Sequence, residues 1–267
     1  MSATLLHAGA LAWYIMAGIF YGANLTLKTP AHTERARIFF LVAVTVHTLA
    51  IGVHCMLTRQ SPFASASGTL SVAAWALALI FLPIEFRSRM PSLGALAAPV
   101  CCLLLFMALA TSGASMAATA EMRRGIVSMH VLLIVFSFAF FALAACCAVL
   151  YVWQYGLLKK HTRGAQFKRL PPLEKVDSLA YHLVAFALPM LTIGLALGIA
   201  RAASLHNNWL SDPKTIMSFV AWVVYGGYLT ARTLGGWRGT RLNYLLIAGL
   251  AVTLALYFVP SATHRFS

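Results

Sequence analysis

Long apolar runs alternate with short polar connections along the whole chain. Each run has about the 20 residues that a helix needs to cross the hydrocarbon core of a bilayer. The runs are 5–27, 38–58, 69–86, 93–111, 128–156, 181–203, 215–234 and 242–260. The runs do not alternate between apolar and polar residues as strands do, and they are too long for barrel strands. We therefore expect each run to cross the membrane as a helix. We predict an all-α integral membrane protein, a single transmembrane domain over 1–267 with eight transmembrane helices.

Composition supports the same class of protein. The chain is 61% hydrophobic and only 10% charged, and a soluble domain of this length could not hide so much apolar surface. The first run has no Lys or Arg before it, whereas Lys28, Arg35 and Arg37 follow it. This order is the reverse of that in a secretory signal peptide, so we expect the first run to be a membrane span.

The net charge of +14 could indicate a nucleic-acid partner, but its distribution argues against one. Of the 20 Lys and Arg, 14 lie in or beside the connections after the first, third, fifth and seventh runs. This bias is the positive-inside pattern. It predicts that both termini lie outside the cytoplasm and that the basic connections contact anionic lipid headgroups.

Several function classes lack their sequence signatures. The five cysteines form no Cys-x-x-Cys pair and no haem-attachment motif, so the chain is not itself a c-type cytochrome. It contains no nucleotide-binding loop. Charged residues are scarce in the runs, and we expect Glu85 to be interfacial, close to Arg87 and Arg89. The Gly194 and Gly198 pair has the spacing that lets two helices approach closely.

Histidine is the polar residue that recurs in the runs. His47 lies in the middle of the second run, and His54 follows on the same helix face. His130 is at the outer end of the fifth run, His182 at the cytoplasmic start of the sixth, and His264 follows the eighth. A buried imidazole needs a partner, and a hydrogen bond across helices would suffice.

A ligand is the alternative partner for these histidines. Zinc fits poorly, because no Asp, Glu or Cys accompanies them at ligand spacing. Haem fits better, since it is flat, largely apolar and accepts axial histidines. The histidines His47, His130 and His182 are the candidate ligands of a haem iron.

From His130 onward the chain resembles the CcsA/HemX-like cytochrome c assembly family. The resemblance is carried by "SMHVLLIVFSFAFFALAACCAVLYVWQYGLLK", "LPPLEKVDSLAYHLVAFALPMLTIGLALGIARA" and "WLSDPKTIMSFVAWVVYGGYLTARTLGGWRG". It implies a bacterial inner-membrane protein that handles haem b, with other cytochrome c maturation components as partners. His130 and His264 would be the external haem ligands, and His47 and His182 the membrane-embedded ones.

One segment departs from the family pattern. The full synthases carry a Trp-rich external segment ending in Trp-Asp-Pro-Lys-Glu, whereas this chain keeps Trp209 and Asp212-Pro213-Lys214 and has Thr215 in place of the acidic residue. The chain therefore looks closest to the short HemX-like branch. Locally, Asp212 suits a helix N-cap and Pro213 the first helical position. The resemblance adds that Trp209 and Asp212 belong to a haem-facing surface.

The predicted function is haem handling by axial ligation, with no catalytic nucleophile. Two other functions stay open. One is a regulatory or scaffolding membrane protein of haem metabolism that binds no haem and docks through its basic connection, 157–180. The other is a permease subunit for a small molecule.

Overall fold

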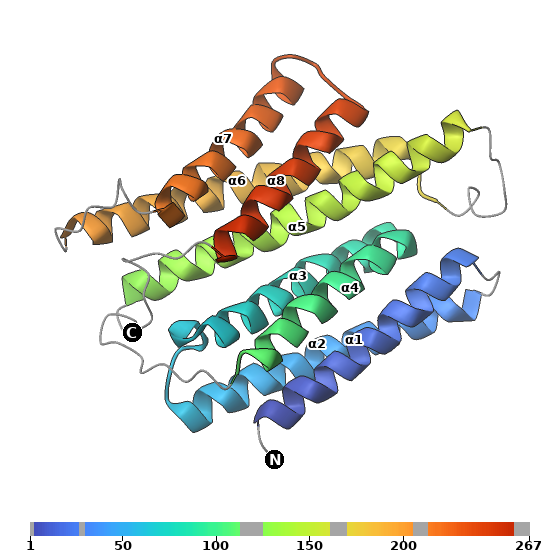
Figure 1. The fold of residues 1–267 in the computed structure, drawn as a ribbon. Helices are drawn as coiled ribbons and strands as arrows, with labels where there is room; N and C mark the ends of the chain where they lie inside the picture. The colour runs from blue at the N-terminus through green and yellow to red at the C-terminus, as the bar shows by residue number, and fades with distance from the viewer. Residues whose placement is uncertain (1–2, 27–29, 113–124, 161–169, 205–212, 259–267) are drawn as a thin grey trace. The chain divides into compact units, whose positions relative to one another are not determined.

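The computed structural model describes residues 3–26, 30–112, 125–160, 170–204 and 213–258. These residues form helices and their connections, with no strand among them. The helices are α1 (Ala3–Thr26), α2 (Pro30–Thr58), the short 3₁₀ helix η1 (Pro62–Ala64), α3 (Ala66–Ser88), α4 (Pro91–Ala110), α5 (Gly125–Lys159), α6 (Leu173–Ser204), α7 (Pro213–Thr233) and α8 (Thr240–Phe258) (Figure 1). The all-α prediction is confirmed.

Each predicted apolar run lies almost entirely within a helix, but the helix ends differ from the ends of the runs. Helices α2 and α6 begin about two turns before their apolar runs, because a polar first turn is still helical. Pro30, Pro91 and Pro213 each stand at a helix start, where the missing N–H of proline costs nothing. By length and composition, α1 to α6 are able to cross a membrane. Eight spans and external termini stay predictions.

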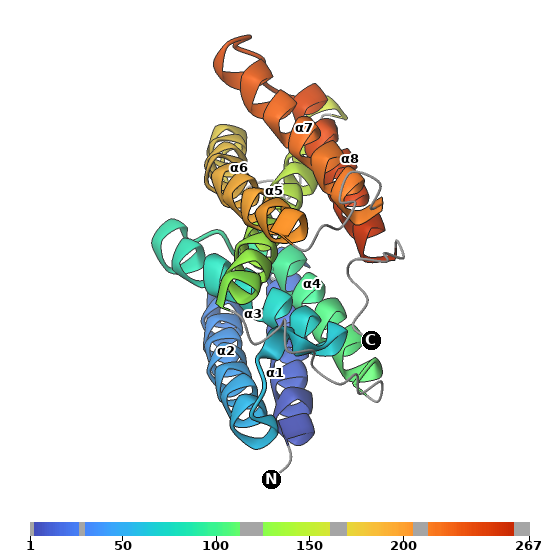
Figure 2. The same cartoon turned by 90° about the vertical axis from the view of Figure 1, so that its left-hand side faces the viewer.

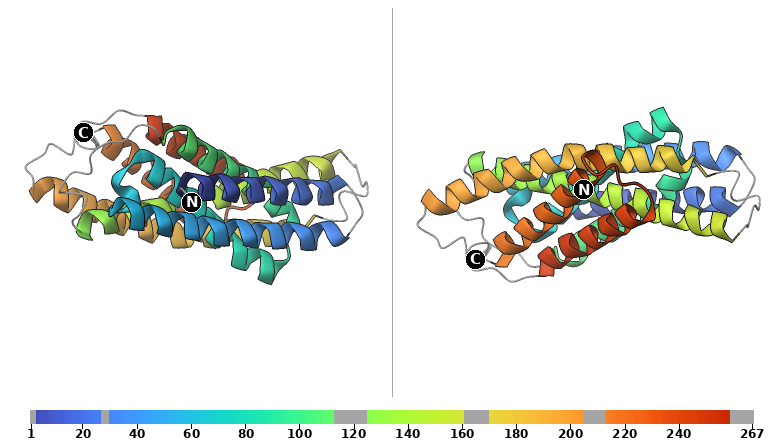
Figure 3. Two further views of the ribbon diagram at one scale, coloured as in Figure 1. Left: turned by 90° about the horizontal axis from the view of Figure 1, so that it is seen from below. Right: turned by 90° about the horizontal axis from the view of Figure 1, so that it is seen from above.

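The chain divides into two compact units. The N-terminal unit comprises Met1–Ala118 with Leu157–Pro171, and the C-terminal unit comprises Thr119–Gly156 with Pro172–Ser267. Within the N-terminal unit, α1 packs along α2 and α4, and α3 packs along α4 (Figures 1 and 3). Within the C-terminal unit, α7 packs along α8 and also contacts α6 (Figure 2).

Aromatic side chains fill the core of the N-terminal unit. Tyr21, Phe40 and Phe81 are fully buried, and their ring centroids lie 5.0 to 6.3 Å apart. Gly94 on α4 is required beside them, because a Cβ there would lie 2.8 Å from the ring of Tyr21. These aromatic residues therefore stabilise the packing of the helices.

One interhelical contact occurs in both units. In the N-terminal unit, the indole N–H of Trp75 on α3 donates to the hydroxyl of Thr48 on α2 at 2.8 Å. In the C-terminal unit, Trp222 on α7 donates to Thr192 on α6 at 2.9 Å. Each threonine hydroxyl in turn donates to the carbonyl one turn earlier in its own helix. The second and third helices of each unit thus meet through the same hydrogen-bonded pair.

A second contact, about three turns away, keeps the same register. Arg37 on α2 pairs with Glu85 on α3 at 2.8 Å. At the corresponding places in the C-terminal unit, Arg232 on α7 lies over the ring of Tyr181 on α6 at 5.3 Å. Arg232 also pairs with Asp177 at 2.5 Å. The two units therefore share one packing register between these helices.

The position of Glu85 differs from the sequence prediction. It was expected at the interface beside Arg87 and Arg89, but its side chain is only 1% exposed and its partner is Arg37. The sequence suggested Arg87 and Arg89 because they are close to Glu85 in the chain. The actual partner lies on another helix, and it is set by how α2 and α3 pack against one another. The pairing offsets part of the cost of burying this carboxylate, whose second oxygen has no hydrogen-bond partner among the described residues.

Candidate functional site

A chain of polar side chains crosses the interior of the N-terminal unit. Nδ1 of His47 lies 3.4 Å from the hydroxyl of Tyr14, and its Nε2 lies 3.0 Å from the hydroxyl of Ser71. The same Ser71 hydroxyl lies 3.1 Å from Nε2 of His7. Nδ1 of His7 ends the chain at the carbonyl of Ala3, 2.8 Å away. Helices α1, α2 and α3 each contribute to this polar chain.

The terminal carbonyl fixes the direction of every hydrogen bond in the polar chain. A carbonyl only accepts, so Nδ1 of His7 carries the proton and Nε2 of neutral His7 is an acceptor. Ser71 must then donate its single hydroxyl proton to His7 and accept from Nε2 of His47. Nδ1 of His47 is left as the acceptor for the hydroxyl of Tyr14. With both imidazoles neutral, all four groups are satisfied.

This arrangement leaves His47 without an available nitrogen. Its side chain is fully buried and both ring nitrogens are engaged, so ligation of an iron would require the polar chain to break. The rings of His47 and His54 lie 5.7 and 6.4 Å from that of His7. Even so, no group of three His, Cys, Asp or Glu able to hold a metal ion occurs in the part of the chain that the structure describes.

His130 has a different environment in the C-terminal unit. It lies in the second turn of α5 and is half-buried against α6. Nδ1 lies 2.6 Å from the carbonyl of Gly194, so this nitrogen carries the proton. Among the described residues, Nε2 has no hydrogen-bond partner. A neutral imidazole held in this way offers its Nε2 lone pair to a ligand.

His182 has the same hydrogen-bonding pattern near the start of α6. Its Nδ1 donates to the carbonyl of Ser178 at 2.7 Å, its ring lies 5.2 Å from that of Tyr181, and its side chain is exposed. No described residue accepts from or donates to its Nε2. His182 therefore also presents one free nitrogen on an oriented ring.

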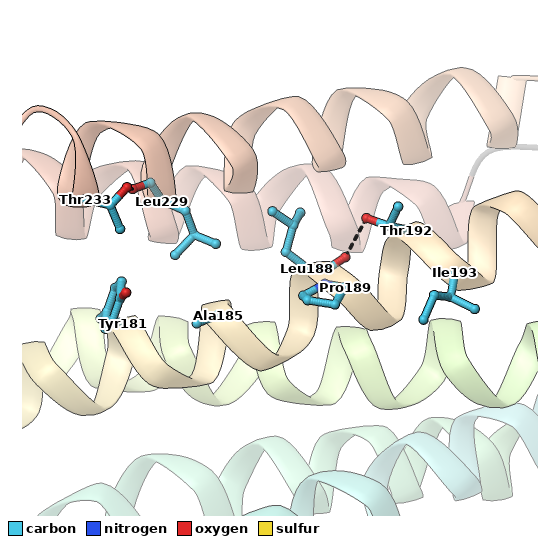
Figure 4. A pocket seen from close by; sticks show the side chains of 8 residues that line it. All are labelled: Tyr181, Ala185, Leu188, Pro189, Thr192, Ile193, Leu229 and Thr233. Atoms are coloured by element: carbon cyan, nitrogen blue, oxygen red, sulfur yellow. Dashed lines mark hydrogen bonds between the residues drawn. The ribbon is translucent and has the colours of Figure 1, made fainter.

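A groove runs along α6 beside His182. It has a volume of about 330 Å³, within the range of small-molecule sites. Its lining residues are Tyr181, Ala185, Leu188, Pro189, Thr192, Ile193, Leu229 and Thr233 (Figure 4). Helical spacing places His182 on the same face of α6 as Ala185 and Pro189. Pro189 has no N–H, so the Ala185 carbonyl lacks its usual helical partner.

His130 and His182 are too far apart to bind one iron together. His130 contacts α6 at Gly194, which lies about 18 Å along the helix axis from His182 at a rise of about 1.5 Å per residue. Two nitrogens that bind one metal ion lie within about 4 Å of one another, because metal–nitrogen distances are about 2 Å. These two histidines belong to separate positions along α6.

The remaining predicted residues, His264, Trp209 and Asp212, lie outside the described residues. The helix after Asp212 begins at Pro213, as the sequence predicted. Sequence reasoning missed the polar partners of His47. His7 lies near the start of the first apolar run, and a serine such as Ser71 has no signal that distinguishes it from other helix-packing serines.

Comparison with known proteins gives consistent matches over most of the chain. The family model described as "Cytochrome C assembly protein" matches residues 64–264. "Cytochrome c biogenesis protein CcsA" of Guillardia theta is 24% identical over 250 residues, which cover 85% of this chain and 83% of that protein. "Protein HemX" of Bacillus subtilis (strain 168) is 25% identical over 266 residues, covering 98% and 96%.

A solved structure shows the same fold. "Cytochrome c Heme Lyase CcmF" superimposes with a TM-score of 0.71 at 15% sequence identity. The match covers 98% of this chain but 48% of that chain, so this chain corresponds to about half of it. At this identity the likeness concerns the fold alone.

Proposed function

We propose that this chain, which belongs to the cytochrome c assembly protein family, holds haem in the membrane through histidines on α5 and α6. Haem would supply an iron that an imidazole nitrogen can bind. The protein's own contribution is to orient that imidazole, to surround the macrocycle with apolar side chains and to release it to a partner. No acid–base residue is needed for this role.

His130 carries the proposal. Its Nδ1 is committed to the Gly194 carbonyl at 2.6 Å, and its Nε2 has no partner among the described residues. Ligating histidines commonly donate their second N–H to a backbone carbonyl, which fixes the ring and raises the basicity of the ligating nitrogen. The donor set therefore fits haem iron. Positive-inside charge places this end of α5 outside the cytoplasm, so we assign His130 to an outer site.

His182 supplies the second position. It shows the same Nδ1–carbonyl arrangement and shares a face of α6 with the apolar groove. Charge bias places it toward the cytoplasmic side, so we assign it to an inner site or entry point. The engaged nitrogens of His47 favour a structural role for that residue while the polar chain is intact.

Four finer assignments complete the proposal. The haem is of b type, since the sequence has no Cys-x-x-Cys-His motif for covalent attachment. The chain crosses a bacterial inner membrane eight times with both termini outside. It works with other components of cytochrome c maturation. His264, Trp209 and Asp212 would contribute to the outer haem-facing surface.

The direct test is a pyridine haemochrome assay on detergent-purified protein, with an absorption spectrum of each variant. We expect wild-type protein to carry b-type haem. His130→Ala and His182→Ala should each lower the haem content or shift the spectrum, because each removes an oriented imidazole. His47→Ala serves as the comparison, since the structure leaves His47 no free nitrogen.

The outcomes separate the functions cleanly. Haem that is lost in His130→Ala, in protein that still elutes as a folded species, supports the outer site. Wild-type protein that stays haem-free after haem is supplied refutes the proposal, and a regulatory or scaffolding role then takes its place. Haem that is lost only in His47→Ala would move the site to the N-terminal unit.

A further inference from the structure

We propose that Gly198 on α6 is the positioning residue of the outer site. It leaves room for the imidazole of His130 against the helix, so that Nδ1 reaches the carbonyl of Gly194 and Nε2 is left for iron. The inference rests on the proposed haem function of His130. It goes further by assigning the orientation of the ligand to a residue that touches neither haem nor iron.

The geometry at Gly198 leaves no room for a side chain. A Cβ built there would lie 2.5 Å from Cε1 of His130, 2.8 Å from Nδ1 and 3.2 Å from Nε2. Three atoms of one rigid ring thus cover the glycine. An alanine at this position would push the whole ring away from α6, because a ring cannot bend as the end of a long side chain can. Displacement would also lengthen the 2.6 Å hydrogen bond to Gly194.

Gly194 and Gly198 therefore have distinct roles. A Cβ on Gly194 would lie 2.9 Å from Cδ1 of Ile134, so the absence of a side chain there lets α5 and α6 pack closely. A Cβ on Gly198 would instead meet the ring of His130. The spacing of the two glycines indicated helix packing alone, whereas the structure shows that the second glycine accommodates an imidazole.

The N-terminal unit provides an internal comparison. His54 lies as far beyond Thr48 on α2 as Gly198 lies beyond Thr192 on α6, so the two residues hold equivalent places in the shared register. The ring of His54 lies 6.4 Å from that of His7, near the start of the first helix of that unit. There Ser71 also engages Nε2 of His7. In the N-terminal unit this position holds His54, and both ring nitrogens of His7 are engaged. In the C-terminal unit it holds Gly198, and Nε2 of His130 has no partner among the described residues.

The test uses Gly198→Ala in the full-length protein, with Gly226→Ala as the matched control. Gly226 is also helical and lies in the same unit, but a Cβ there would meet nothing within 4 Å. Disturbing a partner that orients a ligand commonly lowers affinity about 10- to 100-fold. We expect Gly198→Ala to lower haem affinity by about tenfold or more, and to shift the spectrum and midpoint potential of any haem retained. Gly226→Ala should match wild type in all three.

A second pair of variants replaces the His130 side chain by free imidazole, so that the test does not depend on how a tethered ring adjusts. In His130→Gly, added imidazole should enter the vacated place and restore the wild-type spectrum. In the double variant His130→Gly with Gly198→Ala, the alanine methyl occupies part of that place. The imidazole concentration needed for half-restoration should therefore rise by about tenfold or more.

Each result is decisive. If His130→Ala loses haem while Gly198→Ala keeps wild-type affinity, spectrum and potential, the positioning role is wrong and the proposed function stands. Equal restoration of both His130→Gly backgrounds by imidazole would also overturn it. If His130→Ala keeps all its haem unchanged, the outer site itself is wrong, and the role of Gly198 falls with it.

Discussion

Ser71→Ala is the substitution that best tests the polar chain in the N-terminal unit. The Ser71 hydroxyl donates to half-buried His7 and accepts from fully buried His47, so its loss leaves one acceptor and one donor in the bundle unpaired. Each unpaired buried group costs about 1–3 kcal/mol, so the free energy of unfolding should fall by about 2–6 kcal/mol. Hydrocarbon around the helices offers no water to replace the hydroxyl.

Ser137→Ala is the matched control on α5. Ser137 is also fully buried, but its hydroxyl has no hydrogen-bond partner among the described residues, so its removal should leave stability unchanged or raise it slightly. Unfolding can be followed in detergent with a dye that reacts with thiols, because Cys146 and Cys147 are buried and form no disulfide bond among the described residues. At roughly 2–4 °C per kcal/mol, Ser71→Ala should melt at least about 4 °C below wild type.

Equal melting temperatures for the two serine variants would refute the directed polar chain. Tyr14→Phe gives a graded check, because it removes only the terminal donor to His47, across a longer distance of 3.4 Å. Its effect should be smaller, about 1 kcal/mol. A larger loss from Tyr14→Phe than from Ser71→Ala would show that the hydrogen bonds run through another route.

Two further substitutions test the shared register of the units. Thr48→Val and Thr192→Val each remove the acceptor of a tryptophan N–H, and each should cost about 0.6 kcal/mol in the same melting assay. Thr45→Val, which loses only a bond within its own helix, should cost less. Asp177→Asn should destabilise by up to about 3 kcal/mol, since it leaves the partly buried charge of Arg232 without its carboxylate. The double variant Asp177→Arg with Arg232→Asp should recover part of the lost stability. If it recovers none, the contact between these two side chains contributes little.

The helices could be predicted because hydrocarbon imposes one solution on a long apolar run. Hydropathy located the apolar part of each helix, but it could not locate the polar first turns of α2 and α6, which are helical for reasons of backbone hydrogen bonding. The pairing of Glu85 with Arg37 could not be predicted either. It depends on how α2 and α3 slide along one another, which apolar periodicity leaves undetermined.

The candidate site shows the same division at the level of single atoms. The sequence singled out His47, His130 and His182 as candidate iron ligands, but it could not show which of their ring nitrogens are engaged. What separates them is the partner of each ring nitrogen: two side chains for His47, and one backbone carbonyl each for His130 and His182. Such partners come from other helices or from an earlier turn, so no local pattern around a histidine reveals them.

The two units share their packing, yet both ring nitrogens of His7 are engaged, whereas Nε2 of His130 has no partner among the described residues. The same tryptophan–threonine pair fixes the second and third helices of each unit, so the framework around His7 and His130 is alike. The two histidines then differ in two local features. Ser71 engages Nε2 of His7, and Gly198 leaves room for the ring of His130 against α6. A shared framework with one satisfied and one unsatisfied imidazole is what we expect if the first unit stabilises the bundle and the second holds the ligand.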